Sequence, residues 1–415
     1  MQENSPRPRI VVAGGGAAGF FGAIQAASLA PEAEVLLLER GGEVLSKVRI
    51  SGGGRCNLTH ACWEPKELVK AYPRGHKELL GPFHRFAAGD TVDWFERNGV
   101  ETKIEDDGRI FPVSDQSASV VECLTETAEA LGIQVQLQTT LTGLVPPGPD
   151  KPGWEVHTSK GVLTADCVLL ATGGHARTWD MLAELGLEVV EPVPSLFTFN
   201  IADPRLNGLA GLSVPEVVLT VSGTSLQASG PLLVTHWGVS GPAVLRLSAW
   251  GARELHAAGY QATLLVNWVG GLSETQVSQI LQEQQLDMAR RQVPHSPCLG
   301  LPLRLWERLC QTAGIPADRR WADLSRTERE TLAGQITACA LWMDGKSTFK
   351  EEFVTAGGVA LREIDFRRFA CKKYPGLFMA GEILDIDGIT GGYNFQAAWT
   401  GGWIAGAAMA EYTTG

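Results

Sequence analysis

The sequence has no run of about 18 apolar residues, which is the length that a membrane-spanning helix requires. Residues 1–8 are polar and lack the apolar core of a signal peptide, so we expect a cytoplasmic protein with no membrane partner. Basic residues are in deficit, with 35 Lys and Arg against 46 Asp and Glu. The net charge of −11 argues against nucleic acid as the main partner, because a phosphate-binding surface needs clustered positive charge.

The eight cysteines form no C-x-x-C pair and no pair at the spacing of zinc ligands. We therefore expect reduced thiols in a reducing compartment, and no metal site. At 415 residues the chain is too long for one typical core, so the sequence predicts two or three domains.

The sequence does contain a glycine-rich turn close to its N-terminus. An apolar strand is expected over residues 9–13, a helix of small residues over 17–29, and a second apolar strand over 34–38. The second strand ends at Glu39, 20 residues past Gly19, where a carboxylate can accept hydrogen bonds from a ribose.

The glycines of this turn match the roles of a dinucleotide-binding fingerprint. Gly14 is expected to make the tight turn, and Gly16, which has no side chain, to let a pyrophosphate approach the backbone. Gly19 would let the helix pack closely on the strand, and the helix N-terminus supplies N–H donors and partial positive charge. Strand, turn, helix and acid together predict a bound dinucleotide; an ordinary glycine turn in an α/β protein is the alternative.

A second glycine-rich segment, residues 40–59, is predicted to be a loop. Its adjacent glycines, 52–54, permit positive φ and close approach to a ligand, and cations flank them, so the loop can wrap a pyrophosphate and the ring beyond it. A flexible surface loop is the alternative. Cys56 lies beside Arg55, which can lower a thiol pKa, but we expect a small packing residue because no resolving cysteine lies at a redox spacing.

Two strands in the first half of the chain are also expected to meet the cofactor. The strand over residues 133–137 would pass beside the adenine near Val135. The buried parallel strand over 167–174 ends in small residues, and its carboxyl end would bring Thr172 and Gly173 to the cofactor.

Residues 376–394 form the last informative segment, a strand, an acidic loop and a Gly-Gly turn that precede a helix over 395–410. Gly391 and Gly392 let backbone N–H groups approach a ring system, and the helix N-terminus adds positive potential. A reduced flavin carries negative charge over its pyrimidine edge, so this arrangement would stabilise it. A C-terminal packing helix is the alternative.

Seven segments carry the motifs of a known family, and they lie between residue 9 and about residue 408. They are residues 14–19, 50–59, 108–112, 171–174, 235–242, 355–359 and 381–394. Through them the chain resembles the BaiN/RdsA (YhiN-like, aminoacetone-oxidase-like) family of NAD(P)/FAD-dependent oxidoreductases. One departure is His60, where we expect asparagine after the threonine.

The resemblance implies an α/β fold with a split Rossmann-like FAD-binding domain, in which a parallel sheet has helices on both faces. It also implies an inserted α+β domain, β-rich and then helical, that closes over the isoalloxazine. We expect the FAD-binding domain over residues 1–194 and 343–415 and the insert over 195–342. A shift in composition near Val190, where prolines follow, marks the first boundary.

The resemblance assigns cofactor-binding residues position by position. Those implied for the ADP half of FAD are Gly14, Gly16, Ala18, Gly19 and Glu39. Those implied for the diphosphate and flavin side are Arg40, Lys47, Ser51, Gly53, Arg55 and Cys56. Those implied for the ribityl chain and the pyrimidine edge are Gly381, Glu382, Asp385, Gly392, Tyr393 and Asn394.

We hypothesise an FAD-dependent oxidoreductase that passes a hydride between a donor and a small organic substrate through a non-covalent flavin. No second G-x-G-x-x-G has strand–helix context, so NAD(P)H, as the donor, would bind transiently as a co-substrate. One alternative is a flavin oxidase of a small amine that releases hydrogen peroxide, and another is a non-catalytic flavin-binding redox sensor. No catalytic acid or base is assigned; the candidates whose segments should border the ring are Arg55, His236 and Tyr393.

Overall fold

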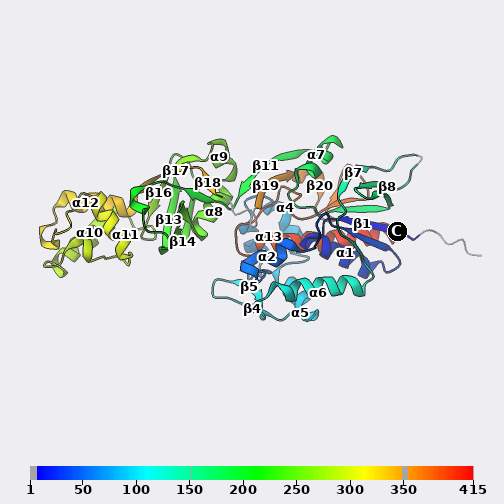
Figure 1. Ribbon diagram of the computed structural model, residues 1–415, viewed down its shortest axis with the longest axis horizontal. Helices are drawn as coiled ribbons and strands as arrows, with labels where there is room; N and C mark the ends of the chain where they lie inside the picture. Colours follow the sequence, from blue (N-terminus) through cyan, green and yellow to red (C-terminus); the bar gives the residue numbers. More distant parts are fainter. Residues whose placement is uncertain (1–6, 150, 348–353, 415) are drawn as a thin grey trace, which may run out of the picture. The chain divides into compact units, whose positions relative to one another are not determined.

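The computed structural model describes residues 7–149, 151–347 and 354–414. The chain divides into two units: unit 1 is Met1–Val193 with Val354–Gly415, and unit 2 is Pro194–Phe353 (Figure 1). The first six residues of the polar N-terminal stretch lie outside the described residues. The first and last parts of the chain therefore belong to one unit, and the other unit is inserted between them.

Unit 1 is organised around a seven-stranded sheet in the order β20–β21–β22–β10–β1–β2–β6. In its middle, Val11 lies opposite Leu36 on one side and Val168 on the other. The central strands are near-continuous apolar runs, as expected of strands covered on both faces. The parallel strands are β1 (Arg9–Ala13), β2 (Glu34–Leu38), β6 (Gln134–Gln136), β10 (Cys167–Leu170) and β22 (Leu377–Met379). The antiparallel strands are β20 (Ile364–Asp365) and β21 (Ala370–Cys371).

Two helices from opposite ends of the sequence, α1 (Ala17–Leu29) and α13 (Tyr393–Thr414), pack backbone to backbone against each other. A Cβ at Gly402 would lie 2.4 Å from the carbonyl oxygen of Ala18, and one at Gly406 would lie 2.5 Å from that of Gly22. Only glycine fits at such approaches. The front of the chain and its tail are thereby joined.

Shorter elements surround this core. The other helices of unit 1 are α2 (Ser46–Gly54), α3 (Pro65–Leu68), α4 (His76–Phe83), α5 (Ala88–Arg97), α6 (Ser117–Ala130) and α7 (Ala176–Glu184). Two three-stranded antiparallel sheets are β3 (Thr59–His60), β5 (Arg109–Pro112) and β4 (Thr102–Ile104), and β7 (Leu141–Val145), β8 (Trp154–Thr158) and β9 (Gly161–Ala165). A two-stranded sheet pairs β11 (Val189–Ser195) with β19 (Val354–Val359).

The segment predicted to be a loop over residues 40–59 contains helix α2, so the prediction is wrong there. Leu45, which directly precedes the helix, and Val48 within it are each 1% exposed, and their burial anchors a short helix that the glycine content concealed. The helix is broken at Ser51, which is extended with ψ 152°, and at Gly52 and Gly53, with φ +58° and +70°. The glycines therefore form an irregular turn, as expected.

Unit 2 is built on a seven-stranded antiparallel sheet in the order β17–β16–β13–β14–β15–β12–β18. Strand β12 also contacts β17 near the opposite end of this order, so the sheet curls. The strands are β12 (Thr198–Asn200), β13 (Ser213–Val221), β14 (Gln227–Val234), β15 (Gly238–Ser240), β16 (Gln261–Asn267), β17 (Cys339–Asp344) and β18 (Lys346–Ser347). The helices are α8 (Pro242–Trp250), α9 (Ala252–Ala257), α10 (Glu274–Asp287), α11 (Leu303–Thr312) and α12 (Arg326–Thr337).

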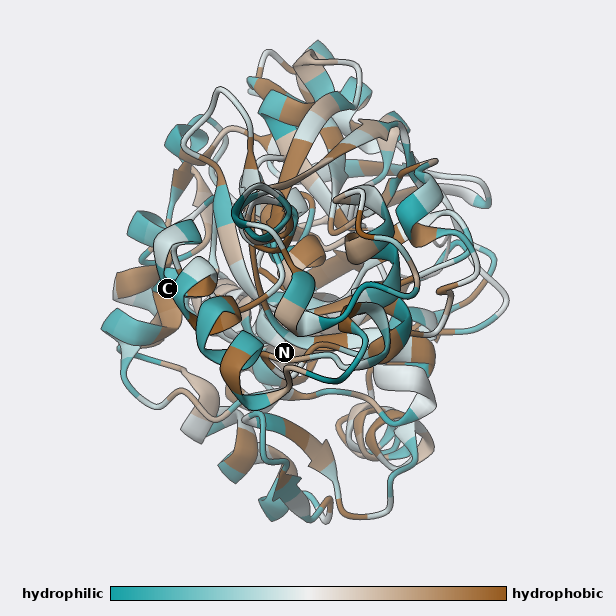
Figure 2. Cartoon of the chain, turned by 90° about the vertical axis from the view of Figure 1, so that its left-hand side faces the viewer, coloured by the Kyte–Doolittle hydropathy of each residue, from teal (hydrophilic) through white to brown (hydrophobic). Residues whose placement is uncertain are grey.

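Each unit has its own buried core, and in unit 2 this core contains Trp268, Trp306 and Trp321. Hydrophobic and hydrophilic residues alternate along many helices, shown in brown and teal in Figure 2, as expected of helices that cover a core. None of the described helices is long and apolar enough to cross a membrane. The predicted fold class, an α/β domain split by a β-rich and helical insert, is confirmed.

Candidate functional site

The turn between β1 and α1 has the backbone geometry that its glycines require. Gly14 has φ +117°, and a Cβ there would lie 2.3 Å from the carbonyl oxygen of Ala171. A Cβ at Gly19 would lie 1.9 Å from the carbonyl oxygen of Gly14, so this glycine sets the helix against the turn. Above Gly16 there is open space, because a Cβ there would meet nothing within 4 Å. As the N-cap of α1 without a side-chain capping bond, Gly16 leaves the helix N-terminus to an anion.

Glu39 is held at the end of β2 by two backbone amides. Its Oε2 accepts a hydrogen bond from the N–H of Gly15 at 2.9 Å, and its Oε1 accepts one from the N–H of Gly41 at 2.7 Å. Each carboxylate oxygen has a second lone pair, so the group can still accept hydrogen bonds from two hydroxyls. The amides therefore orient Glu39 for the ribose role predicted for it.

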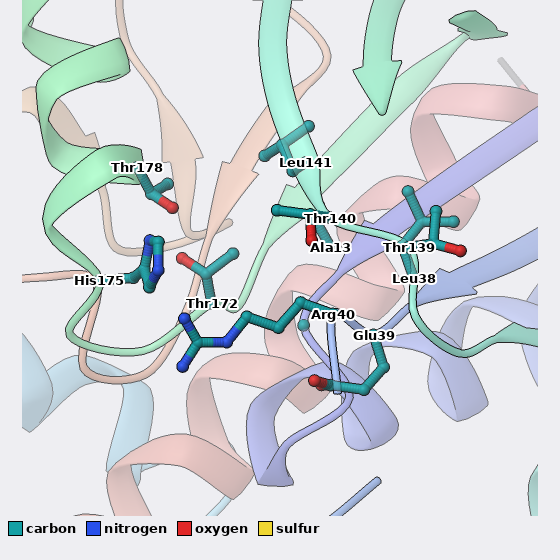
Figure 3. A pocket seen from close by; sticks show the side chains of 11 residues that line it. Ala13, Leu38, Glu39, Arg40, Thr139, Thr140, Leu141, Thr172, His175 and Thr178 are labelled. Carbon is teal, nitrogen blue, oxygen red and sulfur yellow. The ribbon is translucent and has the colours of Figure 1, made fainter. Parts of the chain in front are cut away.

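A pocket lies at the carboxyl ends of β1, β2 and β10 (Figure 3). In this view the Arg40 side chain extends along the pocket toward Thr172 and His175. The hydroxyl of Thr172 is buried and has no hydrogen-bond partner in the described structure. Burial, and then the charges of Arg40 and Arg177, lower the pKa of His175, so its imidazole is neutral near pH 7. A buried hydroxyl without a partner needs a ligand or a water to complete it.

The predicted adenine contact, Val135, does not line this pocket. Val135 is 40% exposed on the edge strand β6. The segment just after β6 contributes instead, together with the start of α7. The lining residues that sequence reasoning missed are Thr139, Thr140, Leu141, His175 and Thr178. Their position immediately beyond two predicted parallel strands was the available signal, because ligands bind outside the carboxyl ends of such strands.

The tail of the chain reaches the same region at Gly381 and Glu382. The Nζ of Lys47 donates a hydrogen bond of 2.6 Å to the Oε2 of Glu382. A Cβ at Gly173 would lie 3.7 Å from that oxygen, and a Cβ at Gly381 would lie 3.2 Å from the Cβ of Ala18. The front helix, the loop, β10 and the tail, which are far apart in the sequence, therefore meet here.

Arg55, a candidate for both cofactor binding and catalysis, has partners from its own unit. Its Nη1 lies 2.5 Å from an oxygen of Glu105 and 3.4 Å from one of Asp115, and its guanidinium lies 3.9 Å from the centre of the Phe111 ring. The hydrogen bond to Glu105 contributes most to raising the pKa of Arg55. A guanidinium that stays charged does not donate its proton near pH 7, so any contribution of Arg55 to a reaction would be through its charge.

Cys56 is fully buried, and burial raises the pKa of its thiol to about 12. Burial disfavours a reactive thiolate at this position, which agrees with the packing interpretation of Cys56. Its neighbours shape the turn: Ser51 donates through its hydroxyl to the carbonyl of Val48 at 3.0 Å. Gly53 has open space where a Cβ would point, so a ligand can approach its backbone.

Tyr393 begins α13 and faces the ring of His60. The two rings stack with centres 4.8 Å apart, and the Nδ1 of His60 lies 3.2 Å from the carbonyl oxygen of Gly391. Burial lowers the pKa of His60. Tyr72 donates its hydroxyl to the carbonyl of Tyr393 at 2.6 Å. A Cβ at Gly392 would lie 2.6 Å from the carbonyl carbon of Thr59, so this glycine serves contact with the loop.

The acidic loop that precedes α13 is fixed from within unit 1. Asp387 is fully buried and receives two hydrogen bonds from the guanidinium of Arg74. Asn394 closes the loop, because its amide nitrogen donates to the carbonyl of Gly388 at 3.0 Å and its oxygen accepts from the N–H of Gly388 at 2.8 Å. Asp385 is 7% exposed in the same loop. These contacts order the loop.

The third catalytic candidate, His236, lies in unit 2. It is exposed in the turn between β14 and β15 and lines a pocket of that unit. Among the described residues, no group of three His, Cys, Asp or Glu side chains is placed to hold a metal ion.

The residues around the front turn fit the adenosine and diphosphate of FAD. Open space lies at the N-terminus of α1 beside Gly16, the Glu39 carboxylate has free lone pairs, and the Thr172 hydroxyl has no partner. These are the features that a diphosphate, a ribose and a further polar group of the cofactor require.

Comparison with known proteins extends over nearly the whole chain. A family model described as HI0933-like protein Rossmann domain matches residues 8–408. The chain is 29% identical to the ribosomal RNA dihydrouridine synthase of Escherichia coli (strain K12), covering 95% of this chain and 96% of that protein. It is also 29% identical to the 3-dehydro-bile acid delta(4,6)-reductase of Clostridium scindens, covering 97% of this chain and 99% of that protein.

A solved structure with a similar fold is the 3-ketosteroid-delta4-(5alpha)-dehydrogenase of Rhodococcus jostii RHA1. The TM-score is 0.52 with 17% sequence identity, and the match covers 99% of this chain and 98% of that one. At this identity the likeness concerns the fold alone.

Proposed function

The chain belongs to the HI0933-like protein Rossmann domain family, and from this premise we propose that it reduces a carbon–carbon double bond conjugated to a carbonyl group. Family membership confirms the predicted class, an FAD-dependent oxidoreductase, and FAD as its cofactor. The substrate, the donor and the roles of individual residues are our proposals.

The names of the two relatives carry this proposal. A dihydrouridine synthase saturates the double bond of a uracil ring, and a delta(4,6)-reductase of a 3-dehydro bile acid acts on double bonds conjugated with a 3-keto group. The two substrates share little except a carbon–carbon double bond conjugated to a carbonyl. Both relatives match nearly the full length of this chain, so the shared chemistry, rather than either substrate, is what we transfer.

The reaction adds one hydride and one proton across the double bond. FAD, when bound and reduced, supplies the hydride, and NAD(P)H, oxidised to NAD(P)⁺, supplies the two electrons that restore it. The chain positions the cofactor through the glycine turn and Glu39 at one end and through the tail at the other. Transient binding of NAD(P)H is supported by the single G-x-G-x-x-G with strand–helix context.

The proton must come from a side chain acidic enough to protonate the enolate that hydride addition leaves on the substrate. Arg55 is excluded as the donor because the carboxylates beside it hold the guanidinium in its charged form. Tyr393 is therefore the candidate donor in unit 1, with its ring stacked on His60. Tyr393→Phe keeps the ring and removes the hydroxyl, so it should lower kcat while FAD binding stays unchanged.

The test is an anaerobic incubation of the FAD-loaded full chain with NADH or NADPH and one conjugated substrate. One arm contains a uridine-bearing RNA and the other a 3-oxo-Δ4 steroid, and mass spectrometry measures the gain of two hydrogen atoms. Gain in either arm supports the proposal. A gain of hydrogen in neither arm contradicts the proposal. Aerobic release of hydrogen peroxide with a small amine would then favour the flavin oxidase. A bound flavin that no donor reduces would favour the non-catalytic redox sensor.

A further inference from the structure

The turn between β14 and β15 presents an aromatic side chain to solvent. Trp237 is 67% exposed, more than any other tryptophan in the described chain. The backbone around it is fixed: Thr235 N–H donates to the carbonyl of Gly238 at 2.8 Å, and Ile201 N–H donates to the carbonyl of Trp237 at 2.8 Å. The Trp237 N–H also donates to the hydroxyl of Thr235 at 3.3 Å. An exposed indole on a fixed turn is a ready platform for stacking.

Beside this platform lies a pocket of about 260 Å³. Leu233 and Val234 of β14 and the segment 210–211 give it apolar walls, and Thr198 and Thr235 contribute hydroxyls. Drug-sized ligands occupy pockets of roughly 300–1,000 Å³. A volume below that range suits a single planar ring with polar edges better than a four-ring steroid.

Two arginines of α11 donate hydrogen bonds to the segment that leads into the pocket wall. Arg304 donates to the carbonyl of Gly208, and Arg308 donates to the carbonyl of Asn207 at 3.3 Å. Two residues further along, the same segment forms the pocket wall at 210–211. Carbonyl acceptors orient a guanidinium without neutralising it, and neither arginine forms an ion pair within the part of the chain that the structure describes.

The segment of the sequence that contains α11 has a charge opposite in sign to that of the whole chain. Residues 290–329 contain eight Arg and four Asp and Glu, a formal charge of +4, whereas the full chain carries −11. The prediction that nucleic acid is not a partner was drawn from the overall charge. A phosphate backbone responds to the charge near the site that binds it, so the overall value does not decide the question for unit 2.

We propose that unit 2 carries a binding site for single-stranded RNA. One base stacks on Trp237 and enters the adjacent pocket, and Arg304 and Arg308 contact the neighbouring phosphates. Single-stranded rather than paired RNA is the expected ligand, because a base must be unstacked to meet an aromatic side chain. The proposal rests on the proposed function, because it selects an RNA-borne uracil over a steroid as the conjugated substrate.

The experiment measures binding of fluorescein-labelled oligouridine to the FAD-loaded full chain by fluorescence anisotropy, with an RNA duplex of equal length as competitor. Trp237→Ala should weaken binding at least about fivefold, since base–aromatic stacking carries the contact. Arg304→Gln with Arg308→Gln should lower the slope of log affinity against log salt by about 1.4.

Matched controls are Trp342→Ala, which removes a tryptophan that is 55% exposed on β17, and Arg326→Gln on α12, where the arginine pairs with Glu330. Both should bind oligouridine as the unmodified chain does. The proposal is overturned if the chain binds no single-stranded RNA, or if Trp237→Ala binds oligouridine as tightly as the unmodified chain does.

The anisotropy readout is independent of turnover, which separates this proposal from the proposed function. Reduction of the double bond of a conjugated steroid without RNA binding would support the proposed function and reject the RNA site. Trp237-dependent RNA binding without reduction of any conjugated substrate would support the RNA site and reject the proposed function.

Discussion

Replacing Arg74 with methionine is expected to destabilise unit 1 strongly. The Asp387 side chain is 0% exposed and that of Arg74 is 11% exposed, and the guanidinium donates to both carboxylate oxygens. Asp387 lies in the acidic loop that precedes α13, so the pair fixes the loop to the segment before α4. Arg74→Met removes the guanidinium and leaves a buried carboxylate without its cation.

The expected loss of stability is about 3–5 kcal/mol, which is typical when one partner of a buried ion pair is removed. Most of this is the cost of an uncompensated buried charge rather than the value of the pair. A double variant, Arg74→Met with Asp387→Leu, should therefore recover most of the loss, because it removes both charges.

The assay is urea denaturation of the FAD-loaded chain, followed through release of the flavin, which reports on unit 1. All variants must be measured at the same FAD concentration, because bound ligand adds to apparent stability. Arg97→Met is the control, since Arg97 and Asp93 form an exposed pair on α5 that should contribute nothing measurable. The reasoning is refuted if Arg74→Met matches the unmodified chain, or if the double variant is as unstable as the single one.

Three further outcomes follow from the site. Gly14→Ala should abolish FAD binding, because the Cβ would lie 2.3 Å from a backbone oxygen and φ is +117°. Gly42→Ala is the control and should bind FAD normally, because a Cβ at Gly42 meets open space. Equal FAD binding by the two variants would contradict this reasoning. Burial lowers the pKa of His60 in the folded chain below its value in the unfolded chain. As the pH falls below about 6.5, His60 is therefore protonated in the unfolded chain before it is in the folded chain, and the free energy of unfolding decreases. His60→Asn should reduce that loss in denaturation measured from pH 7 down to pH 5, and an unchanged pH profile would count against it. Iodoacetamide at neutral pH should label the half-buried Cys62 before Cys56, whose thiol pKa is about 12; peptide mass spectrometry would expose the opposite order.

The parts of the site that could be predicted from the sequence are those set by local backbone geometry. Gly14 and Gly19 are required by approaches of 2.3 and 1.9 Å to backbone atoms, and such contacts recur at a fixed spacing in the turn. The buried strands were predictable for a similar reason, because a near-continuous apolar run fits a strand covered on both faces.

The parts that could not be predicted depend on contacts between distant segments. Lys47 meets Glu382 across 335 residues, and Arg74 meets Asp387 across 313, and no local pattern encodes either pairing. Helix α2 was missed because two buried side chains outweigh the glycines that follow them. Val135 is exposed on an edge strand and does not line the pocket, and the order of strands in a sheet is not encoded in any local pattern.

The most direct test of the flavin site is the absorption spectrum of the purified full chain during titration with FAD. We expect a visible flavin band that saturates at one FAD per chain, with binding lost in Gly14→Ala and kept in Gly42→Ala. A chain that remains colourless at every FAD concentration would contradict the central claim that its front turn and its tail hold one flavin.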